Sequence, residues 1–502
     1  MAKAIDLRSA AFYFNSASEY IIFIRYFLHI LCKIEFYRLT LVIIKHIISI
    51  YFANILQNGG DYMLLEFKAS NYKSFKDELV FSLIPAPKQK GLDYSVQEEI
   101  IEKRAYRSLC SAVIYGPNAS GKTNIIGAMD TFKSVVLRGH LRNAEDKNNP
   151  NAAADALELI PNNAAESPMP VSFSVKFIAD GILIEYAFSA DLGTFLDVDY
   201  KRRILSESLS VNENKIFARG KELEFGSLQS IEAFMVNAFE QNEEGAKALA
   251  KSNLNDEELF LMNGFKNMFS AKLVTLITEW LDHKFMVIYR ADAMQLIRKF
   301  SDPKKKSVYI EKTLNEAATY FGINSNALGY VVEGDNNEAK LCSVFKHSAR
   351  GTAIPAELFE SYGTIRFANM FPLVVNALLN GGTLIVDEFD ASLHPMALMN
   401  IINIFHNDEI NVKHAQLIFN THNPIFLNPN LYRRDEIKFV ERDDCLHVSN
   451  HYSLSDFGTA GKNGVRKNED YMKNYFVDRY GAIKDIDFTP IFEELIFQGK
   501  EV

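Results

Sequence analysis

The run Gly-Pro-Asn-Ala-Ser-Gly-Lys-Thr at 116–123 constrains this chain more than any other stretch. Its spacing, G-x-x-x-x-G-K-[ST], is typical of a loop that wraps around phosphate groups. The apolar residues 110–115 before it predict a buried strand, and residues 124–131 after it predict a helix. Glycines let the backbone N–H groups of such a loop turn toward an anion, and the helix N-terminus adds its positive dipole. This strand, loop and helix together predict a nucleotide-binding site.

The loop offers both a cation and a metal ligand. Lys122 can reach the β- and γ-phosphates of a nucleotide, and the hydroxyl group of Thr123 can bind Mg²⁺. We therefore predict ATP and Mg²⁺ as the bound groups. The residues expected to contact the nucleotide are Gly116, Pro117, Asn118, Ala119, Ser120, Gly121, Lys122, Thr123 and Asn124.

A second apolar strand ends in two carboxylates. Residues 383–386 are Thr-Leu-Ile-Val, and Asp387 and Glu388 follow them. We expect Asp387 to hold Mg²⁺ through its water shell beside Thr123. We expect Glu388 to orient and deprotonate the attacking water. An Asp-Glu pair at the end of a strand is common and can simply cap the next helix. A phosphate loop on the same chain favours the catalytic interpretation.

The next strand along the chain, 416–419, leads to His422. A histidine at a strand tip can hydrogen-bond the γ-phosphate and report whether it is present. A lone histidine is more often structural. Its place after the strand that follows the carboxylates favours the sensor role.

Ser361 and Gly363 precede a helix, and a Ser and a Gly at a helix N-terminus predict a second anion site. This second site cannot bind the same phosphate in its own subunit, because the phosphate loop already occupies that side. We therefore expect the segment with Ser361 and Gly363 to complete the ATP site of a partner subunit in a dimer. A plain helix cap is the alternative.

Strands that alternate with helices predict an α/β sheet with its chemistry at the carboxyl ends of the strands. Two alternating runs around Asp180-Gly181 predict a β-hairpin. Apolar residues at helical spacing between Leu259 and Trp280 predict a helical block. The expected parts are an N-terminal lobe of a nucleotide-binding head at 63–204, a helical insertion at 205–345, a C-terminal lobe at 346–460 and a C-terminal tail at 461–502.

The first 62 residues differ from the rest because charges interrupt a strongly apolar composition. No uninterrupted stretch is long enough for a transmembrane helix, and the segment does not resemble a secretory signal. Two interpretations stay open. The codons for residues 59–62 can form a purine-rich ribosome-binding site before Met63, so the segment is translated upstream sequence. Alternatively, it is an amphipathic helical extension.

Composition limits the binding partners and the cellular compartment that we expect. The net charge of -9 favours neither nucleic acid nor an anionic membrane as the main partner. Four widely spaced cysteines argue against a zinc site or a disulfide framework and fit a reducing cytoplasm.

These motifs, in this order, resemble the ABC-type ATPase heads of the SMC, RecF and OLD group. The closer likeness is to the AAA15/AAA21-type ATP-binding proteins of abortive infection. The resemblance covers Met63 to about Ile483, and its matching stretches are 65–75, 116–123, 360–364, 384–395, 416–422, 433–440, 452–457 and 479–483.

The resemblance implies an α/β P-loop ATPase head of ABC/SMC type with a helical insertion. It implies hydrolysis of ATP to ADP and phosphate by a homodimer or higher homo-oligomer whose heads sandwich ATP. It further implies a role in bacterial antiphage defence together with a separate effector. The chain departs from the family pattern at Glu360, Tyr362 and Thr364 in the signature loop and at His394 in the D-loop, and the Q-loop glutamine is not identified.

Two other functions compete with this interpretation. A DNA-repair ATPase of the RecF or SMC kind would need a basic path for DNA, which the acidic balance does not support. A slow nucleotide-sensing scaffold for an effector would need no hydrolysis. The presence of both Lys122 and Glu388 favours turnover.

Overall fold

The structure of the chain is a computed structural model. It describes residues 62–87, 89, 91–142, 158–164, 169–193, 200–235, 242–289, 298–299, 308–320, 322, 326–332, 338–345, 353–460, 464–467 and 469–498. These residues belong to one compact unit, Asp61–Val502. Both interpretations of the N-terminal segment concern residues outside the described part, apart from Tyr62.

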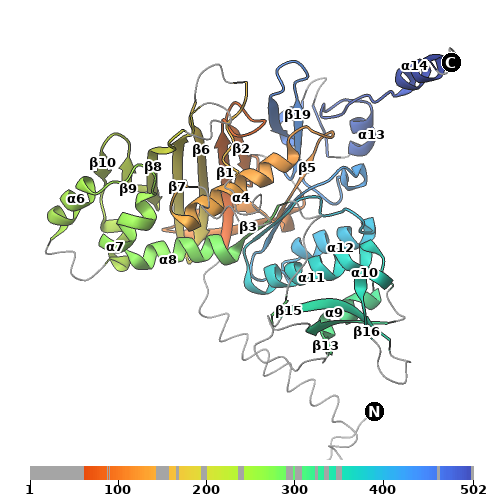
Figure 1. Cartoon of the computed structure of the whole chain (residues 1–502), viewed down its shortest axis with the longest axis horizontal. Helices are drawn as coiled ribbons and strands as arrows, with labels where there is room; N and C mark the ends of the chain where they lie inside the picture. Colours follow the sequence, from red (N-terminus) through yellow and green to blue (C-terminus); the bar gives the residue numbers. More distant parts are fainter. Residues whose placement is uncertain are drawn as a thin grey trace, which may run out of the picture. The chain divides into compact units, whose positions relative to one another are not determined.

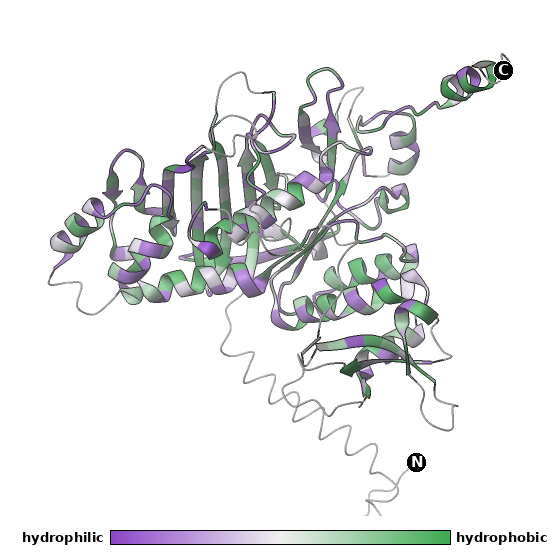
Figure 2. Cartoon of the chain, in the orientation of Figure 1, coloured by the Kyte–Doolittle hydropathy of each residue, from purple (hydrophilic) through white to green (hydrophobic). Residues whose placement is uncertain are grey.

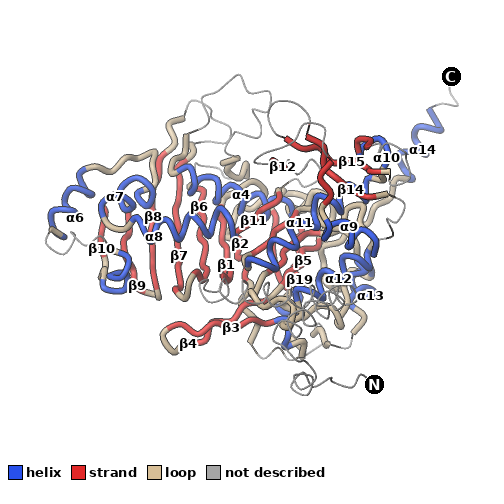
Figure 3. The backbone as a smooth tube through the Cα atoms, turned by 90° about the horizontal axis from the view of Figure 1, so that it is seen from below, coloured by secondary structure: helices blue, strands red, loops and turns tan. Residues whose placement is uncertain are grey.

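An antiparallel sheet of seven strands has the order β10-β9-β8-β7-β6-β1-β2, and Figure 3 shows its strands side by side. Asp180 and Gly181 have φ angles of 48° and 73° between β6 and β7, as a type I′ turn requires. The predicted hairpin is therefore confirmed. The strands are β1 (Tyr62–Ser70), β2 (Leu79–Ser82), β6 (Val171–Ala179), β7 (Ile182–Asp191), β8 (Arg203–Val211), β9 (Asn214–Arg219) and β10 (Leu223–Phe225).

A second sheet has the order β11-β17-β18-β5-β19-β20, in which the first five strands are parallel. Every residue of β5, β17 and β18 is buried, as expected for strands covered on both faces, and these strands are largely green in Figure 2. The predicted α/β fold class is confirmed. The strands are β5 (Ser111–Tyr115), β11 (Phe285–Ile288), β17 (Thr383–Val386), β18 (Gln416–Asn420), β19 (Ile437–Arg442) and β20 (Ser449–Ser453).

Helix α4 (Lys122–Arg138) packs against the seven-stranded sheet (Figure 1). The ring of Phe132 on α4 lies 5.8 Å from the ring of Phe67 on β1 and 6.3 Å from that of Phe173 on β6, between centroids. The other main helices are α6 (Glu243–Ser252), α7 (Lys266–Met268), α8 (Ala271–Glu279), α9 (Lys312–Tyr320), α10 (Ala356–Phe359), α11 (Tyr362–Asn380), α12 (Pro395–Phe405), α13 (Tyr471–Phe476) and α14 (Thr489–Gln498). Within the described ranges, no helix combines the length and the apolar character needed to cross a bilayer.

The expectation that 205–345 is mainly helical is wrong in part. The apolar stripe from Leu259 to Trp280 does form α7, α8 and two flanking π-helical turns, and both end residues are fully buried. The same range also supplies most of β8, all of β9 and β10, and the parallel strand β11. It contributes to a further sheet of β12 (Arg298–Lys299), β13 (Val308–Ile310), β14 (Ala327–Val332) and β15 (Glu338–Val344), which β16 (Ala353–Pro355) joins.

Several of these strands are short, and β11 pairs with the distant strand β17, so they escaped prediction. Asn212 and Glu213 form a two-residue turn with φ angles of 49° and 65° between β8 and β9, so a local hairpin pattern was present. The remaining described strand pair is β3 (Val96–Ile101) with β4 (Arg104–Leu109). The division of the chain into the four predicted parts stays a prediction.

A buried glutamine joins the two large sheets. The Gln416 side chain on β18 accepts a hydrogen bond from the backbone N–H of Leu64 at 2.7 Å and one from the Thr383 hydroxyl at 2.9 Å. The two N–H groups of its amide are shared among three acceptors, the Leu64 carbonyl at 3.0 Å, the Ser108 hydroxyl at 2.8 Å and the Leu109 carbonyl at 3.0 Å. This fully buried side chain is therefore saturated, and it ties β1 and β4 to β17 and β18.

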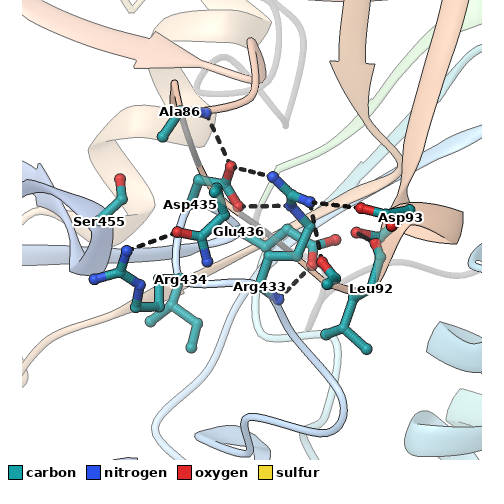
Figure 4. A network of polar contacts seen from close by, with 12 residues as sticks. Ala86, Leu92, Asp93, Arg433, Arg434, Asp435, Glu436 and Ser455 are labelled. Carbon is teal, nitrogen blue, oxygen red and sulfur yellow. Dashed lines mark hydrogen bonds and ion pairs between the residues drawn. The ribbon is translucent and has the colours of Figure 1, made fainter. Parts of the chain in front are cut away.

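A second polar network anchors the start of β19 (Figure 4). Arg433 donates to both oxygens of Asp435 at 3.0 Å, and Asp435 also accepts from the backbone N–H of Ala86 at 2.9 Å. Arg434 donates to the carbonyls of Gly458 and Val465 at 2.5 and 2.6 Å. Arg433 also donates to the Gly91 carbonyl at 3.1 Å, so both guanidinium groups join segments that are far apart in sequence.

Replacing Gln416 by Leu should destabilise the protein by about 2–4 kcal/mol, because five buried polar groups each lose a hydrogen bond at once. Thermal unfolding followed by differential scanning fluorimetry measures the change. The matched control is Gln229→Leu at an exposed position, which should shift stability by less than about 0.5 kcal/mol. Equal unfolding temperatures for the two variants would contradict the bridging role.

Candidate functional site

The predicted phosphate loop joins β5 to α4 and depends on two glycines. Gly121 has φ of 111° and caps the helix N-terminus. A Cβ added there would lie 2.6 Å from the Ser449 hydroxyl and 2.7 Å from the Ser74 hydroxyl. A Cβ on Gly116 would lie 2.2 Å from the carbonyl oxygen of Val440. A side chain at either position would clash with these atoms, so the tight curvature of the loop requires both glycines.

Two serines outside the motif hold the loop in place. The Ser449 hydroxyl on β20 donates to the Ser120 carbonyl at 2.6 Å, and the backbone N–H of Ser449 donates to the Ser74 carbonyl at 2.7 Å. The Asn124 side chain donates to the Ser74 hydroxyl at 2.7 Å. Asn124, predicted to contact nucleotide, thus has a protein partner here. No sequence spacing pointed to Ser449, whereas Ser74 lies in a stretch that carried the family resemblance.

The loop contains a buried hydroxyl group suited to a ligand. Ser120 is 1% exposed, and its hydroxyl has no hydrogen-bond partner in the part of the chain that the structure describes. A buried polar group without a partner costs free energy, which a phosphate oxygen would recover. The loop therefore fits a bound phosphate.

Lys122 lies inside the mouth of the loop. Its ammonium group donates to the carbonyls of Gly116 and Pro117 at 2.8 and 2.9 Å. Burial lowers the pKa of Lys122 to about 8, while the negative charges of Glu388 and Asp387 act in the opposite direction. The lysine is thus a buried cation within electrostatic reach of both predicted carboxylates.

Three distant segments meet at the carboxylate of Asp387, which is 5% exposed. The Thr123 hydroxyl on α4 donates to Asp387 Oδ1 at 3.1 Å, and the Asn420 side chain on β18 donates to the same oxygen at 2.5 Å. A carboxylate beside a hydroxyl group is the kind of hard oxygen pair that Mg²⁺ prefers. The donor set fits the predicted metal.

Glu388 occupies a strained position at the tip of β17. Its φ angle is 49°, and its side chain is exposed. Its backbone N–H donates to the side-chain oxygen of Asn420, and its carbonyl accepts from the guanidinium of Arg366 on α11. A non-glycine residue in this conformation costs about 1–3 kcal/mol and persists only where its surroundings hold it. Asn420 and Arg366, which the sequence did not single out, provide that support.

His422 follows β18, which lies between the loop strand β5 and the carboxylate strand β17. Its pKa is lowered, first by partial burial and second by the positive charge of Lys122. The hydroxyl group of the preceding residue, Thr421, donates to Asp390 at 2.7 Å. His422 is therefore a neutral group at pH 7 near the mouth of the phosphate loop.

Ser361 and Gly363 lie at the start of α11. The Ser361 hydroxyl accepts from the backbone N–H of Thr364 at 3.1 Å, which is the N-cap contact of the alternative interpretation. A Cβ on Gly363 would lie 2.5 Å from the Ser392 carbonyl. His394, at the D-loop departure, caps α12 by accepting from the backbone N–H of Met396 at 3.2 Å. A role for Ser361 and Gly363 across a dimer stays a prediction.

Comparison with solved structures gives likenesses at low sequence identity. The "SMC head domain from Thermotoga maritima" is 14% identical with a TM-score of 0.31, and the match covers 78% of this chain and 98% of that one. The "SmcHead bound to the C-winged helix domain of ScpA" is 13% identical with a TM-score of 0.34, covering 78% and 97%. The Smc head with an extended coiled coil bound to a ScpA domain derived from Pyrococcus furiosus is 13% identical with a TM-score of 0.34, covering 78% and 96%.

No curated protein matches the chain. A family model described as "AAA domain, putative AbiEii toxin, Type IV TA system" matches residues 111–428. That range holds the phosphate loop, both carboxylates and His422, and the match confirms the predicted resemblance. Because it spans more than half of the polypeptide, the chain belongs to this AbiEii-type AAA family.

Proposed function

We propose that this chain binds ATP with Mg²⁺ and hydrolyses it to ADP and phosphate. The observation that supports this most is the meeting of Thr123, Asp387 and Asn420 beside the buried Lys122. Three segments of the chain converge there on one carboxylate at the carboxyl edge of a parallel sheet, where ligands of such folds bind.

Each group has a distinct role in this proposal. Lys122 exchanges its two carbonyl partners for phosphate oxygens, and Thr123 and Asp387 hold the metal. Bound Mg²⁺ supplies charge neutralisation at the phosphates. Glu388 accepts the proton of the attacking water. His422, neutral at pH 7, donates a hydrogen bond to the γ-phosphate.

We propose that two copies close the site between them. The Glu388 side chain is exposed, so the attacking water would face bulk solvent in a single copy. Water exclusion strengthens the electrostatic interactions of a reacting centre. A second copy that presents Ser361 and Gly363 would cover this face, as the family resemblance implies.

We further propose a cytoplasmic antiphage role with a separate effector protein. The family description, which refers to an AbiEii-type toxin and a type IV toxin–antitoxin system, supports this. In bacteria that carry the gene with its neighbours, plating of a phage panel should fall relative to cells with Lys122→Ala. Equal plating on wild-type and variant cells across the panel would contradict the defence role but leave ATP hydrolysis unaffected.

ATP affinity should depend on pH through Lys122. Above a pKa of about 8 the amine becomes neutral and cannot pair with phosphate. Binding of a fluorescent non-hydrolysable ATP analogue should therefore weaken about tenfold between pH 7 and pH 9. Lys122→Arg, whose guanidinium stays charged, should remove this pH dependence, and Lys122→Met should abolish binding. A wild-type affinity that does not change with pH would contradict the assignment.

Glu388→Gln should trap the ATP-bound pair of subunits. The amide cannot accept a proton, so hydrolysis should fall about 10²–10⁴-fold while ATP stays bound. Size-exclusion chromatography with light scattering, with and without ATP, measures the association. Glu409→Gln, an exposed carboxylate after α12, is the control and should behave like wild type. A variant that stays monomeric with saturating ATP would refute closure by a second copy.

A further inference from the structure

Arg366 is a buried cation whose guanidinium hydrogen-bonds to the backbone of the carboxylate segment. It lies in the second turn of α11 and is 4% exposed. One nitrogen of its guanidinium donates to the Glu388 carbonyl and lies 3.5 Å from the Asp387 carbonyl. The guanidinium therefore binds the main chain between the two functional carboxylates.

The start of α11 contacts the same loop at a second point. The segment from Asp387 leads through Glu388 to Ser392, and Ser392 has φ of 63°. Gly363 approaches the Ser392 carbonyl so closely that an added Cβ would lie 2.5 Å away. The first turn of α11 thus contacts the far end of the loop, while Arg366 in the second turn contacts its near end.

Arg366 also acts on the middle of this loop. Burial raises the pKa of Asp390, and the positive charge of Arg366 is among the groups that oppose the rise. Asp390 in turn accepts from the Thr421 hydroxyl at 2.7 Å, next to His422. One guanidinium therefore influences both the carboxylate segment and Asp390, the hydrogen-bond partner of the residue before His422.

The other support of Glu388 comes from a fixed strand. Asn420 belongs to β18, whose neighbours on both sides are hydrogen-bonded strands. Helix α11, in contrast, begins at the surface that the proposed second copy would contact, because Ser361 is its N-cap. Arg366 lies five residues after Ser361, about 7.5 Å along the helix. Any shift of the helix start would reach the Glu388 backbone through this side chain.

We propose that Arg366 is a positioning residue that couples contact at the α11 N-terminus to the placement of Glu388. This inference rests on the proposed ATP hydrolysis. Arg366 holds the Glu388 backbone in its left-handed conformation, and movement of α11 on closure of a second copy aligns the carboxylate with the water. Loss of the guanidinium leaves nucleotide binding intact and removes the alignment.

The test compares Arg366→Met, Arg366→Lys and Arg434→Met. Arg434 is a matched control because it is another buried arginine that donates to two backbone carbonyls, far in sequence from the nucleotide loop. Arg366→Met should lower kcat about 10- to 100-fold with an unchanged KM, the size expected for a misplaced reacting group. Arg366→Lys should give a kcat between those of the Met variant and wild type.

Two further measurements separate coupling from folding. Arg366→Met should bind the fluorescent ATP analogue with wild-type affinity, and Glu388→Gln with Arg366→Met should still associate with ATP. Arg434→Met should lower the unfolding temperature at least as much and keep a normal kcat. A normal kcat for Arg366→Met beside an active wild type, or an equal kcat loss in Arg434→Met, would overturn the coupling alone. A wild-type chain without ATP hydrolysis would overturn both the proposed function and this inference.

Discussion

The carboxylate of Asp387 is the point on which the site depends. Its Oδ1 accepts from Thr123, 264 positions earlier in the chain, and from Asn420, 33 positions later. These contacts exist only because β5, β17 and β18 run parallel in one register, with Val386 beside Phe419 and Asn420 beside Ile114. A shift of one residue in any of these strands would turn the polar side chains to the other face.

That register is held by buried polar groups as well as by apolar packing. Gln416, at the first position of β18, saturates its hydrogen bonds with groups on three other strands. Glu436, before β19, accepts from the Ser111 hydroxyl at 2.8 Å and lies 3.0 Å from His406 at the end of α12. Such networks are satisfied in only one arrangement of the strands, so they specify the alignment that apolar contacts alone would leave loose. The strained backbone of Glu388 can persist because its surroundings are fixed in this way.

The sequence predicted the parts of the site whose chemistry demands particular residues at fixed spacing. A phosphate loop requires Gly116, Gly121, Lys122 and Thr123 in order, and a buried parallel strand that ends in two acids stands out against its apolar neighbours. Asn420, Arg366 and Ser449 had no such pattern. Asn420 lies in a stretch that carried the family resemblance, but no spacing marked it or the other two residues. The role of each arises only when a distant segment is placed beside it.

The strands within 205–345 were missed for a related reason. A stripe as long as the one from Leu259 to Trp280 dominates a search for periodicity, whereas β11 has four residues and gains its identity from pairing with β17.

The central claim is that separate segments enclose one magnesium nucleotide, and Mg²⁺ titration of ATP-analogue binding to wild type and Asp387→Asn tests it most directly. Mg²⁺ should strengthen binding to wild type and have little effect on the variant. An equal gain in both proteins would show that Asp387 does not hold the metal.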